Sequence, residues 1–358
     1  MNAEYTAARA AENLLLNCAE LSSADSLLIV HEDSALGWYD AAVTEAVASA
    51  ARDLGINFQT IEVGAPQNQR DARVIEAMQA HDCTLFLSRI GDQDRFAEPQ
   101  AGKKIVMCYV RTEDMLASGF AGVSYAATLA IKKVLDGLIS RASRIDIQCP
   151  LGTDCSLNQQ PSEFTELSDV SVRRFPLGVV TPIDAGGLNG RVALADFLTP
   201  TGSNVYEPAS LALEEAVFAL IESGRIDKFE GAADTVTSVE QHYQQVAQQF
   251  GIDADFVHSW HVGLHPGLSY LQDAAADPDR WSNTIFNHPR ILHFHTCGAY
   301  APGEISWIVK DPTVVLDGKP LWDRGILRVD DFEETRACLQ QWPELTQLYA
   351  QDAGQVGI

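Results

Sequence analysis

Histidine side chains are concentrated in one part of the chain, where their spacing could serve a metal ion. Six of the nine histidines lie between His258 and His295, and neutral imidazole is the commonest metal ligand in proteins. The first group is His258-Ser-Trp-His-Val-Gly-Leu-His-Pro-Gly267, whose glycines and proline disfavour a long helix. In an extended strand, alternation places His261 and His265 on one face. We expect His261 to be a ligand, whereas His258 fits a hydrogen-bonded residue of the strand and His265 stays open between the two roles.

A second group follows in Arg290-Ile-Leu-His-Phe-His-Thr-Cys-Gly-Ala-Tyr-Ala-Pro-Gly-Glu-Ile-Ser306. Alternation puts His293 and His295 on one strand face, and a glycine-rich turn leads to Glu304 at the start of another strand. The ends of two neighbouring strands beside this turn can converge on one ion. Two histidine-bearing segments and a carboxylate on a rigid scaffold are a better candidate for a metal site than a lone buried histidine.

The elements that must position these groups differ between the two halves of the chain. Apolar runs at 26–31, 57–63, 83–88 and 104–110 alternate with helical segments, which predicts a parallel, doubly wound sheet. Further β-like segments lie at 190–197, 211–220 and 313–316, with one helix at 239–250. We therefore predict an α/β N-terminal domain (1–143) and an α+β, β-rich, metal-binding C-terminal domain (144–358). No GxGxxG follows the first strand, so a dinucleotide site is not indicated.

Composition narrows the function classes. The formal net charge is −24, which repels phosphate backbones and makes nucleic acid a poor partner. The apolar runs are too short to cross a membrane, and the N-terminus has no pattern of a secretory signal. Seven scattered cysteines without a CxxC pair favour reduced thiols in a cytoplasm over a cysteine-based zinc site. We expect a cytoplasmic protein with a small-molecule substrate.

The second half resembles the aminopeptidase T family of metallo-aminopeptidases. The resemblance covers roughly residues 145–325 and rests on the order of several segments: Gly152-Thr-Asp154, Phe175-Pro-Leu-Gly-Val-Val-Thr-Pro182, Ile221-Glu-Ser-Gly-Arg-Ile-Asp-Lys-Phe-Glu-Gly231 and His261-Val-Gly-Leu-His-Pro266. It implies an aminopeptidase T-like fold, a homodimer or higher homo-oligomer formed through the C-terminal domain, and a two-metal hydrolase.

This chain departs from that family's ligand pattern. Val179 occupies the position of the first glutamate ligand, His261 that of the second, and His295 that of a histidine ligand. That family also has a tyrosine near its metal ligands, and its position falls on Tyr300. The family's His-x-Asp motif falls on Glu304-Ile-Ser306. A second dication needs bridging anions. Because Val179 and Ser306 stand where that family has carboxylates, a dinuclear site is not expected here.

A one-iron branch of the same fold, that of 2,5-dihydroxypyridine 5,6-dioxygenase, is similar at Ser259-Trp-His-Val-Gly-Leu-His-Pro266, with a ligand histidine at the position of His261. The leading prediction is a mononuclear non-haem iron oxygenase acting on a small aromatic or heterocyclic molecule. His261, His295 and Glu304 would bind Fe(II), and His265 or Tyr300 would move protons or orient the substrate. The alternatives are a divergent aminopeptidase with zinc, manganese or cobalt, and a metal-free binding protein on the same fold.

Overall fold

The computed structural model describes residues 5–67, 71–92, 102–163, 172–200, 206–298, 303–351 and 354–358. The chain forms two compact units that are each discontinuous in sequence. Unit 1 comprises Met1–Ala130, Leu167–Leu177 and Trp342–Leu348, and unit 2 comprises Ile131–Glu166, Gly178–Gln341 and Tyr349–Ile358. The contacts therefore divide the chain between residues 130 and 131, within a helix. The predicted domain boundary at residue 143 stays a prediction.

Unit 1 is built on a parallel sheet of five strands, which confirms the predicted α/β class. Its order is β2-β1-β3-β4-β7, and every pair is parallel. The central strands are almost wholly buried because helices cover a parallel sheet on both faces. The strands are β1 (Ser26–Glu32), β2 (Asn57–Val63), β3 (Cys83–Leu87), β4 (Lys104–Cys108) and β7 (Arg173–Phe175).

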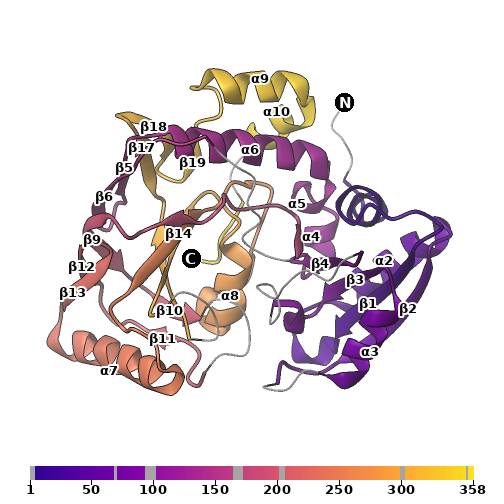
Figure 1. The fold of residues 1–358 in the computed structure, drawn as a ribbon, viewed down its shortest axis with the longest axis horizontal. Coiled ribbons are helices and arrows are strands. Elements are labelled where there is room, and N and C mark those ends of the chain that lie inside the picture. The colour runs from indigo at the N-terminus through magenta and orange to yellow at the C-terminus, as the bar shows by residue number, and fades with distance from the viewer. Residues whose placement is uncertain are drawn as a thin grey trace. The chain divides into compact units, whose positions relative to one another are not determined.

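The helices of unit 1 bury apolar faces against this sheet and one another (Figure 1). In α2 (Ala41–Asp53), Val43, Val47, Ala50 and Ala51 are buried, which is the spacing of one helix face. The other helices are α1 (Ala7–Glu12), which continues as a π-helix through Cys18, α3 (Ala72–Ala80), α4 (Glu113–Leu116) and α5 (Gly119–Gly122). The long helix α6 (Tyr125–Arg141) contributes residues to both units.

Unit 2 contains two largely antiparallel sheets, as expected for a β-rich half. The eight-stranded sheet has the order β13-β12-β9-β6-β5-β17-β18-β19. Its strands are β5 (Arg144–Gln148), β6 (Asp154–Asn158), β9 (Leu188–Leu194), β12 (Val217–Glu222), β13 (Arg225–Glu230), β17 (Thr313–Leu316), β18 (Lys319–Asp323) and β19 (Ile326–Leu327).

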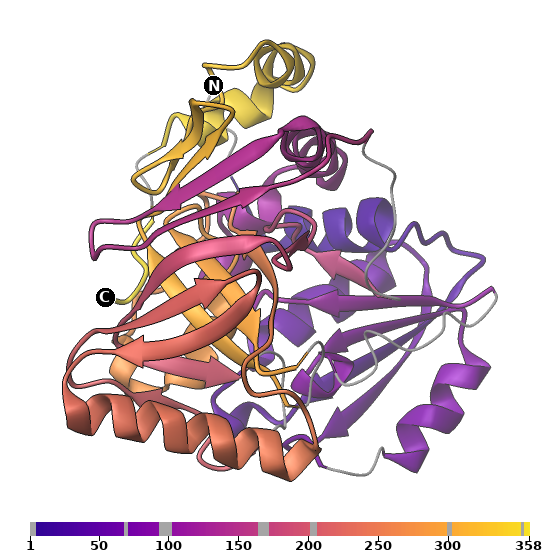
Figure 2. The ribbon, with the colours of Figure 1, turned by 60° about the vertical axis from the view of Figure 1, so that its left-hand side comes forward.

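The six-stranded sheet of unit 2 carries both histidine groups. Its order is β11-β10-β16-β15-β14-β8. The strands are β8 (Ile183–Asp184), β10 (Phe197–Pro200), β11 (Leu211–Ala212), β14 (Val257–Val262), β15 (Ile291–Thr296) and β16 (Ile305–Lys310). Helix α7 (Ala233–Phe250) runs along one side of the unit, as Figure 2 shows. The remaining helices are α8 (Pro278–Ile285) and α9 (Glu333–Gln341) in unit 2, and α10 (Pro343–Tyr349), which belongs to unit 1 except for its last residue.

Two of the predicted strands are each divided in the structure. The run 190–197 is interrupted at Asp196, whose φ of +61° lies in the left-handed region and ends the extended backbone between β9 and β10. The run 211–220 is interrupted at the adjacent exposed residues Glu214 and Glu215, which separate β11 from β12. Local charge and backbone geometry override the apolar pattern in both places.

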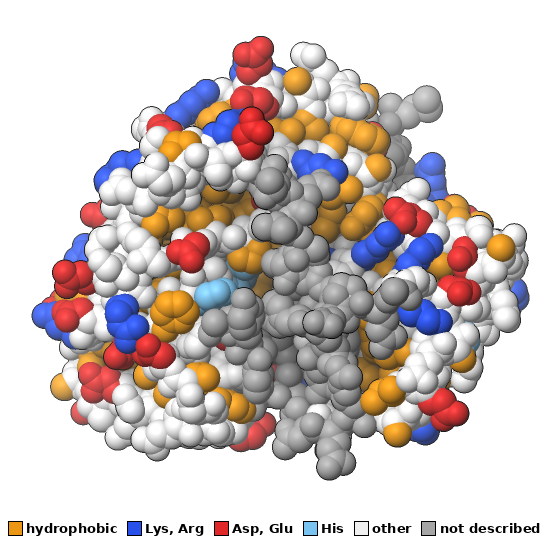
Figure 3. Space-filling model, viewed as in Figure 1, with side chains coloured by type: hydrophobic (Ala, Val, Ile, Leu, Met, Phe, Trp, Pro, Cys, Tyr) orange, Lys and Arg blue, Asp and Glu red, His pale blue; other side chains and the backbone are white. Residues whose placement is uncertain are grey.

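The surface carries side chains of both charges, and all the cysteines are free. On the face shown in Figure 3, the described acidic and basic side chains are interspersed. None of the seven cysteines forms a disulfide. Within the described part of the chain, no helix is long and apolar enough to cross a membrane.

Candidate metal centre

The pairing of β14 with β15 brings three histidines together on one face of the six-stranded sheet. His261 lies directly opposite His293, and Ser259 lies opposite His295. Because side chains two residues apart share a strand face, His295 joins the other two. The candidate ligand atoms of these three histidines all lie within 4.8 Å of one another.

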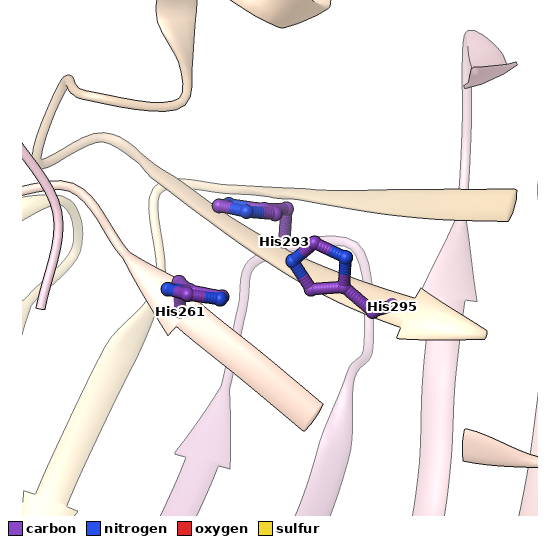
Figure 4. A group of neighbouring side chains, drawn as sticks. All are labelled: His261, His293 and His295. Carbon is purple, nitrogen blue, oxygen red and sulfur yellow. The ribbon is translucent and has the colours of Figure 1, made fainter. Parts of the chain in front are cut away.

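The three rings form a compact, buried arrangement (Figure 4). The rings of His261 and His293 are parallel, with an interplanar angle of 1° and centroids 4.9 Å apart. The His295 ring is tilted by 60° to His261 and by 61° to His293. His293 also stacks against Phe286, with the two ring centroids 4.0 Å apart. The three residues are only 4 to 9% exposed, so a bound ion would sit largely shielded from water.

Two of the imidazoles have an oxygen atom near one ring nitrogen. His261 Nδ1 donates to the Val180 carbonyl at 3.0 Å, and His295 Nδ1 lies 3.3 Å from Glu304 Oε1. Metal-binding histidines typically donate their second ring N–H to a carbonyl or carboxylate, as His261 does. The contact of His295 with Glu304 is close, but it is not a hydrogen bond. Nε2 of each ring is then the atom left for the centre of the cluster.

The Val180 carbonyl is itself held in place by a buried ion pair. Asp136, on α6, accepts hydrogen bonds from the backbone N–H of Thr181 at 2.8 Å and from its hydroxyl at 2.9 Å. Lys132 Nζ lies 2.6 Å from the same carboxylate. These contacts fix the backbone next to Val180, and through it the ring of His261.

A row of hydroxyl groups continues from the histidines across the sheet. Ser306 on β16 lies opposite His295, and Thr199 on β10 lies opposite Ser306. Both side chains are completely buried, and among the described residues their hydroxyl oxygens have no hydrogen-bond partner. Buried polar groups are nearly always hydrogen-bonded in native proteins, so these hydroxyls are suited to a water molecule or a bound ligand.

The structure brings together part of the predicted ligand set. His261 and His295 belong to the cluster, and its third member is His293, which the sequence analysis placed on the same strand face but not in the ligand set. Glu304 lies outside the group of mutually close ligand atoms but faces His295. Tyr300 lies outside the described residues. The predicted ligand assignments stay predictions.

His265 lies in the turn that follows β14 and is completely buried. Its backbone N–H donates to the Asn287 carbonyl at 2.9 Å. Burial, assisted by the nearby His288, lowers the pKa of His265 to about 3. The ring is therefore neutral at physiological pH and a weak proton acceptor. Its predicted part in proton transfer stays untested.

Three buried histidines are expected to make stability depend on pH. Burial lowers the pKa of His242 to about 4, of His265 to about 3 and of His288 to about 4. In the unfolded chain the pKa of histidine is about 6.5. The contribution of each neutral histidine to the free energy of unfolding is therefore fully present above pH 6.5. It is lost as the pH drops toward 4, by up to about 1.4 kcal/mol per pH unit for each histidine.

Urea unfolding at pH 6 and pH 5 measures this dependence. His242→Gln, on α7 and away from the cluster, should reduce the pH slope of the unfolding free energy by about one proton, or about 1.4 kcal/mol per pH unit. A variant with the wild-type slope would show that His242 is not kept neutral by burial.

Comparisons with known proteins agree on the fold. No protein-family model matches the chain, and no curated protein sequence matches it significantly. Among solved structures, 2,5-dihydroxypyridine dioxygenase from Pseudomonas putida KT2440 superposes with a TM-score of 0.58 and 14% identity, covering 92% of this chain and 98% of that chain. AmpT from Thermus thermophilus superposes with a TM-score of 0.52 and 14% identity, covering 89% and 98%.

These likenesses extend over nearly the whole of each chain and confirm the fold resemblance inferred from the sequence. At 14% identity these likenesses show the fold and do not identify the reaction. The chain has the aminopeptidase T-like fold, which it shares with AmpT and with 2,5-dihydroxypyridine dioxygenase.

Proposed function

We propose that the chain is a mononuclear metalloenzyme, a non-haem iron oxygenase that acts on a small aromatic or heterocyclic molecule. The observation that carries this proposal is the convergence of His261, His293 and His295 on one buried sheet face. Imidazole suits iron, zinc, copper and nickel. The carbonyl and the carboxylate behind two of the rings are the outer partners that such a site needs.

The composition of the cluster favours one ion over two. Its three members are all imidazoles, and within the described residues no carboxylate joins them at ligand distance from all three. Paired dications need bridging anions to offset their mutual repulsion. Glu304, the nearest carboxylate, faces His295 Nδ1. A single-ion site is therefore the better fit.

The roles of the residues follow from their placement. The three histidines would hold the ion, and Glu304 would fix the ring orientation of His295. Bound Fe(II) would supply open coordination positions for dioxygen and substrate. Ser306 and Thr199 would donate hydrogen bonds to a hydroxyl or carbonyl group of the substrate. Phe286, flat against His293, adds an aromatic wall, and the structural neighbour that acts on a dihydroxypyridine supports a substrate of this class.

A zinc-dependent hydrolase is the second candidate. Three neutral imidazoles also form the ligand set of some catalytic zinc sites, and AmpT has the same fold. The two candidates require different metals and different reactions, so one experiment separates them.

The test is dioxygen consumption by anaerobically purified protein reconstituted with Fe(II) or with Zn(II). A panel of hydroxylated pyridines and benzenes serves as substrates, and dipeptides serve as substrates for hydrolysis. We expect substrate-dependent dioxygen uptake with Fe(II) alone. Dipeptide hydrolysis by the zinc form without dioxygen uptake by the iron form would replace the oxygenase proposal with the hydrolase.

Glu304→Gln tests whether the carboxylate orients His295 or binds the ion directly. As an outer partner, its loss should weaken metal affinity by roughly 10- to 100-fold without abolishing binding. Competition with a chelator of known affinity measures the change. Metal loss as complete as in His261→Ala would show that Glu304 is a ligand, as the sequence predicts. His258→Gln, a partly exposed histidine bonded to Ser259 Oγ, is the matched control and should bind metal normally.

A further inference from the structure

The geometry of unit 1 points to a second binding site, at Arg111, for the carboxylate group of a small molecule. Arg111 follows β4 closely, at the carboxyl ends of the parallel strands. Ligands of doubly wound sheets bind outside these strand ends. The residues of this site belong to unit 1, whereas the histidine cluster belongs to unit 2.

The Arg111 guanidinium is buried without a matching acceptor. The residue is 1% exposed, and its Nε and Nη1 atoms are fully enclosed with no hydrogen-bond partner among the described residues. An unpaired buried charge is strongly unfavourable, because the lost hydration is not replaced. Such a group in a native protein calls for a missing partner, for example a bound ion or ligand.

Aromatic rings around Arg111 offset only part of this cost. Its guanidinium carbon lies 4.8 Å from the ring centroid of Trp38 and 5.1 Å from that of Tyr39. Cation–π attraction stabilises the charge, but ring faces do not replace the in-plane acceptors that five N–H groups require. Nε and Nη1 of Arg111 therefore stay without an in-plane acceptor among the described residues.

The neighbouring Arg89 packs against the same tryptophan ring but has a carboxylate partner. Its guanidinium carbon lies 4.2 Å from the same Trp38 ring. Unlike Arg111, it is paired with the buried Glu32, with Nε 2.9 Å and Nη2 2.5 Å from Glu32 Oε1. Asp92, the other buried carboxylate nearby, accepts a hydrogen bond from the Tyr109 hydroxyl at 3.0 Å.

The free planar donors of Arg111 and the neighbouring charges favour a single carboxylate as the ligand. Glu32, Asp92 and Arg111 all act on the Tyr39 hydroxyl: burial raises its pKa, Arg111 opposes the rise, and the two carboxylates add to it. Arg89 and Arg111 balance Glu32 and Asp92 in number, but among the described residues no carboxylate forms an ion pair with Arg111. A monoanionic carboxylate matches the planar guanidinium and adds one negative charge to this group, whereas a phosphate dianion adds two beside Glu32 and Asp92.

Benzoate is the probe for this site, and inorganic phosphate is the comparison. Calorimetric titration of the full-length, metal-loaded protein should show saturable benzoate binding and none of phosphate at equal ionic strength. Arg111→Met should weaken benzoate binding tenfold or more, because a charged hydrogen-bond pair is lost. His293→Ala should bind benzoate as tightly as wild type, which separates this site from the metal centre.

Thermal unfolding without ligand gives a second readout with opposite signs for two matched variants. Arg111→Met removes an unpaired buried charge and should raise the unfolding temperature, whereas Arg89→Met leaves Glu32 unpaired and should lower it. Arg73→Met, at an exposed pair with Asp71, should change neither binding nor stability.

Three results would each overturn the proposal. These are absence of benzoate binding, unchanged benzoate affinity in Arg111→Met, and destabilisation by Arg111→Met as large as that by Arg89→Met. Phosphate binding that depends on Arg111 would overturn the assignment to a carboxylate.

Discussion

His293→Ala is expected to abolish metal binding and, with it, any metal-dependent activity. The substitution removes the ring that lies opposite His261 and between the other two imidazoles and Phe286. Two imidazoles remain, and they leave the ion with too few protein ligands for a stable site. Metal content after reconstitution and gel filtration measures the loss.

This substitution also decides between the two possible ligand sets. The set inferred from the sequence contains His261, His295 and Glu304, so His293→Ala would retain the ion under that assignment. The set supported by the cluster contains His293 in place of Glu304. Retention of one ion per chain by His293→Ala, together with its loss from Glu304→Gln, would contradict the three-histidine centre.

Gly263→Ala is expected to destabilise the protein strongly, by about 3 kcal/mol or more. Gly263 follows the last residue of β14, and an added Cβ would overlap the backbone of His288 and Asn287. Those atoms cannot move easily, because their carbonyl oxygens accept hydrogen bonds from Ile291 and His265. The clash would displace the end of β14 and with it His261.

Urea unfolding of the metal-free protein measures this effect, and metal titration measures its consequence at the centre. Gly64→Ala is the matched control, since an added Cβ there meets nothing within 4 Å; its unfolding free energy should change by less than about 0.5 kcal/mol. An unfolding midpoint for Gly263→Ala equal to that of wild type would show that the close packing at this turn is not required.

The fold of unit 1 could be predicted wherever the pattern is local. The apolar runs of β1, β3 and β4 mark strands buried on both faces, and the helices between them fix the parallel arrangement. Strand β7 could not be found in this way, because it has only three residues and owes its extended form to pairing with β4, far earlier in the chain. Long-range pairing of this kind leaves little trace in a local sequence pattern.

The candidate site could be predicted in part for the same reason. Strand alternation places His293 and His295 on one face, and the resemblance to known proteins singles out His261. The register that sets His261 opposite His293 depends on the pairing of β14 with β15, which are separated by a long connection containing α8. The orientation of Glu304 toward His295 depends on the next pairing, of β15 with β16.

The unmatched charge of Arg111 has no signature in the sequence at all. Arginine side chains are mostly exposed, and only the packing of Trp38 and Tyr39 shows that this one is enclosed. The homo-oligomer implied by the family resemblance also stays a prediction.

The most direct test of the central claim is the metal content of the wild-type chain after anaerobic reconstitution with Fe(II) and removal of loosely bound ions. The three-histidine centre predicts about one iron per chain, since its ligand set accommodates a single ion. Two ions per chain would contradict the mononuclear centre, and no bound ion would contradict a metal centre altogether.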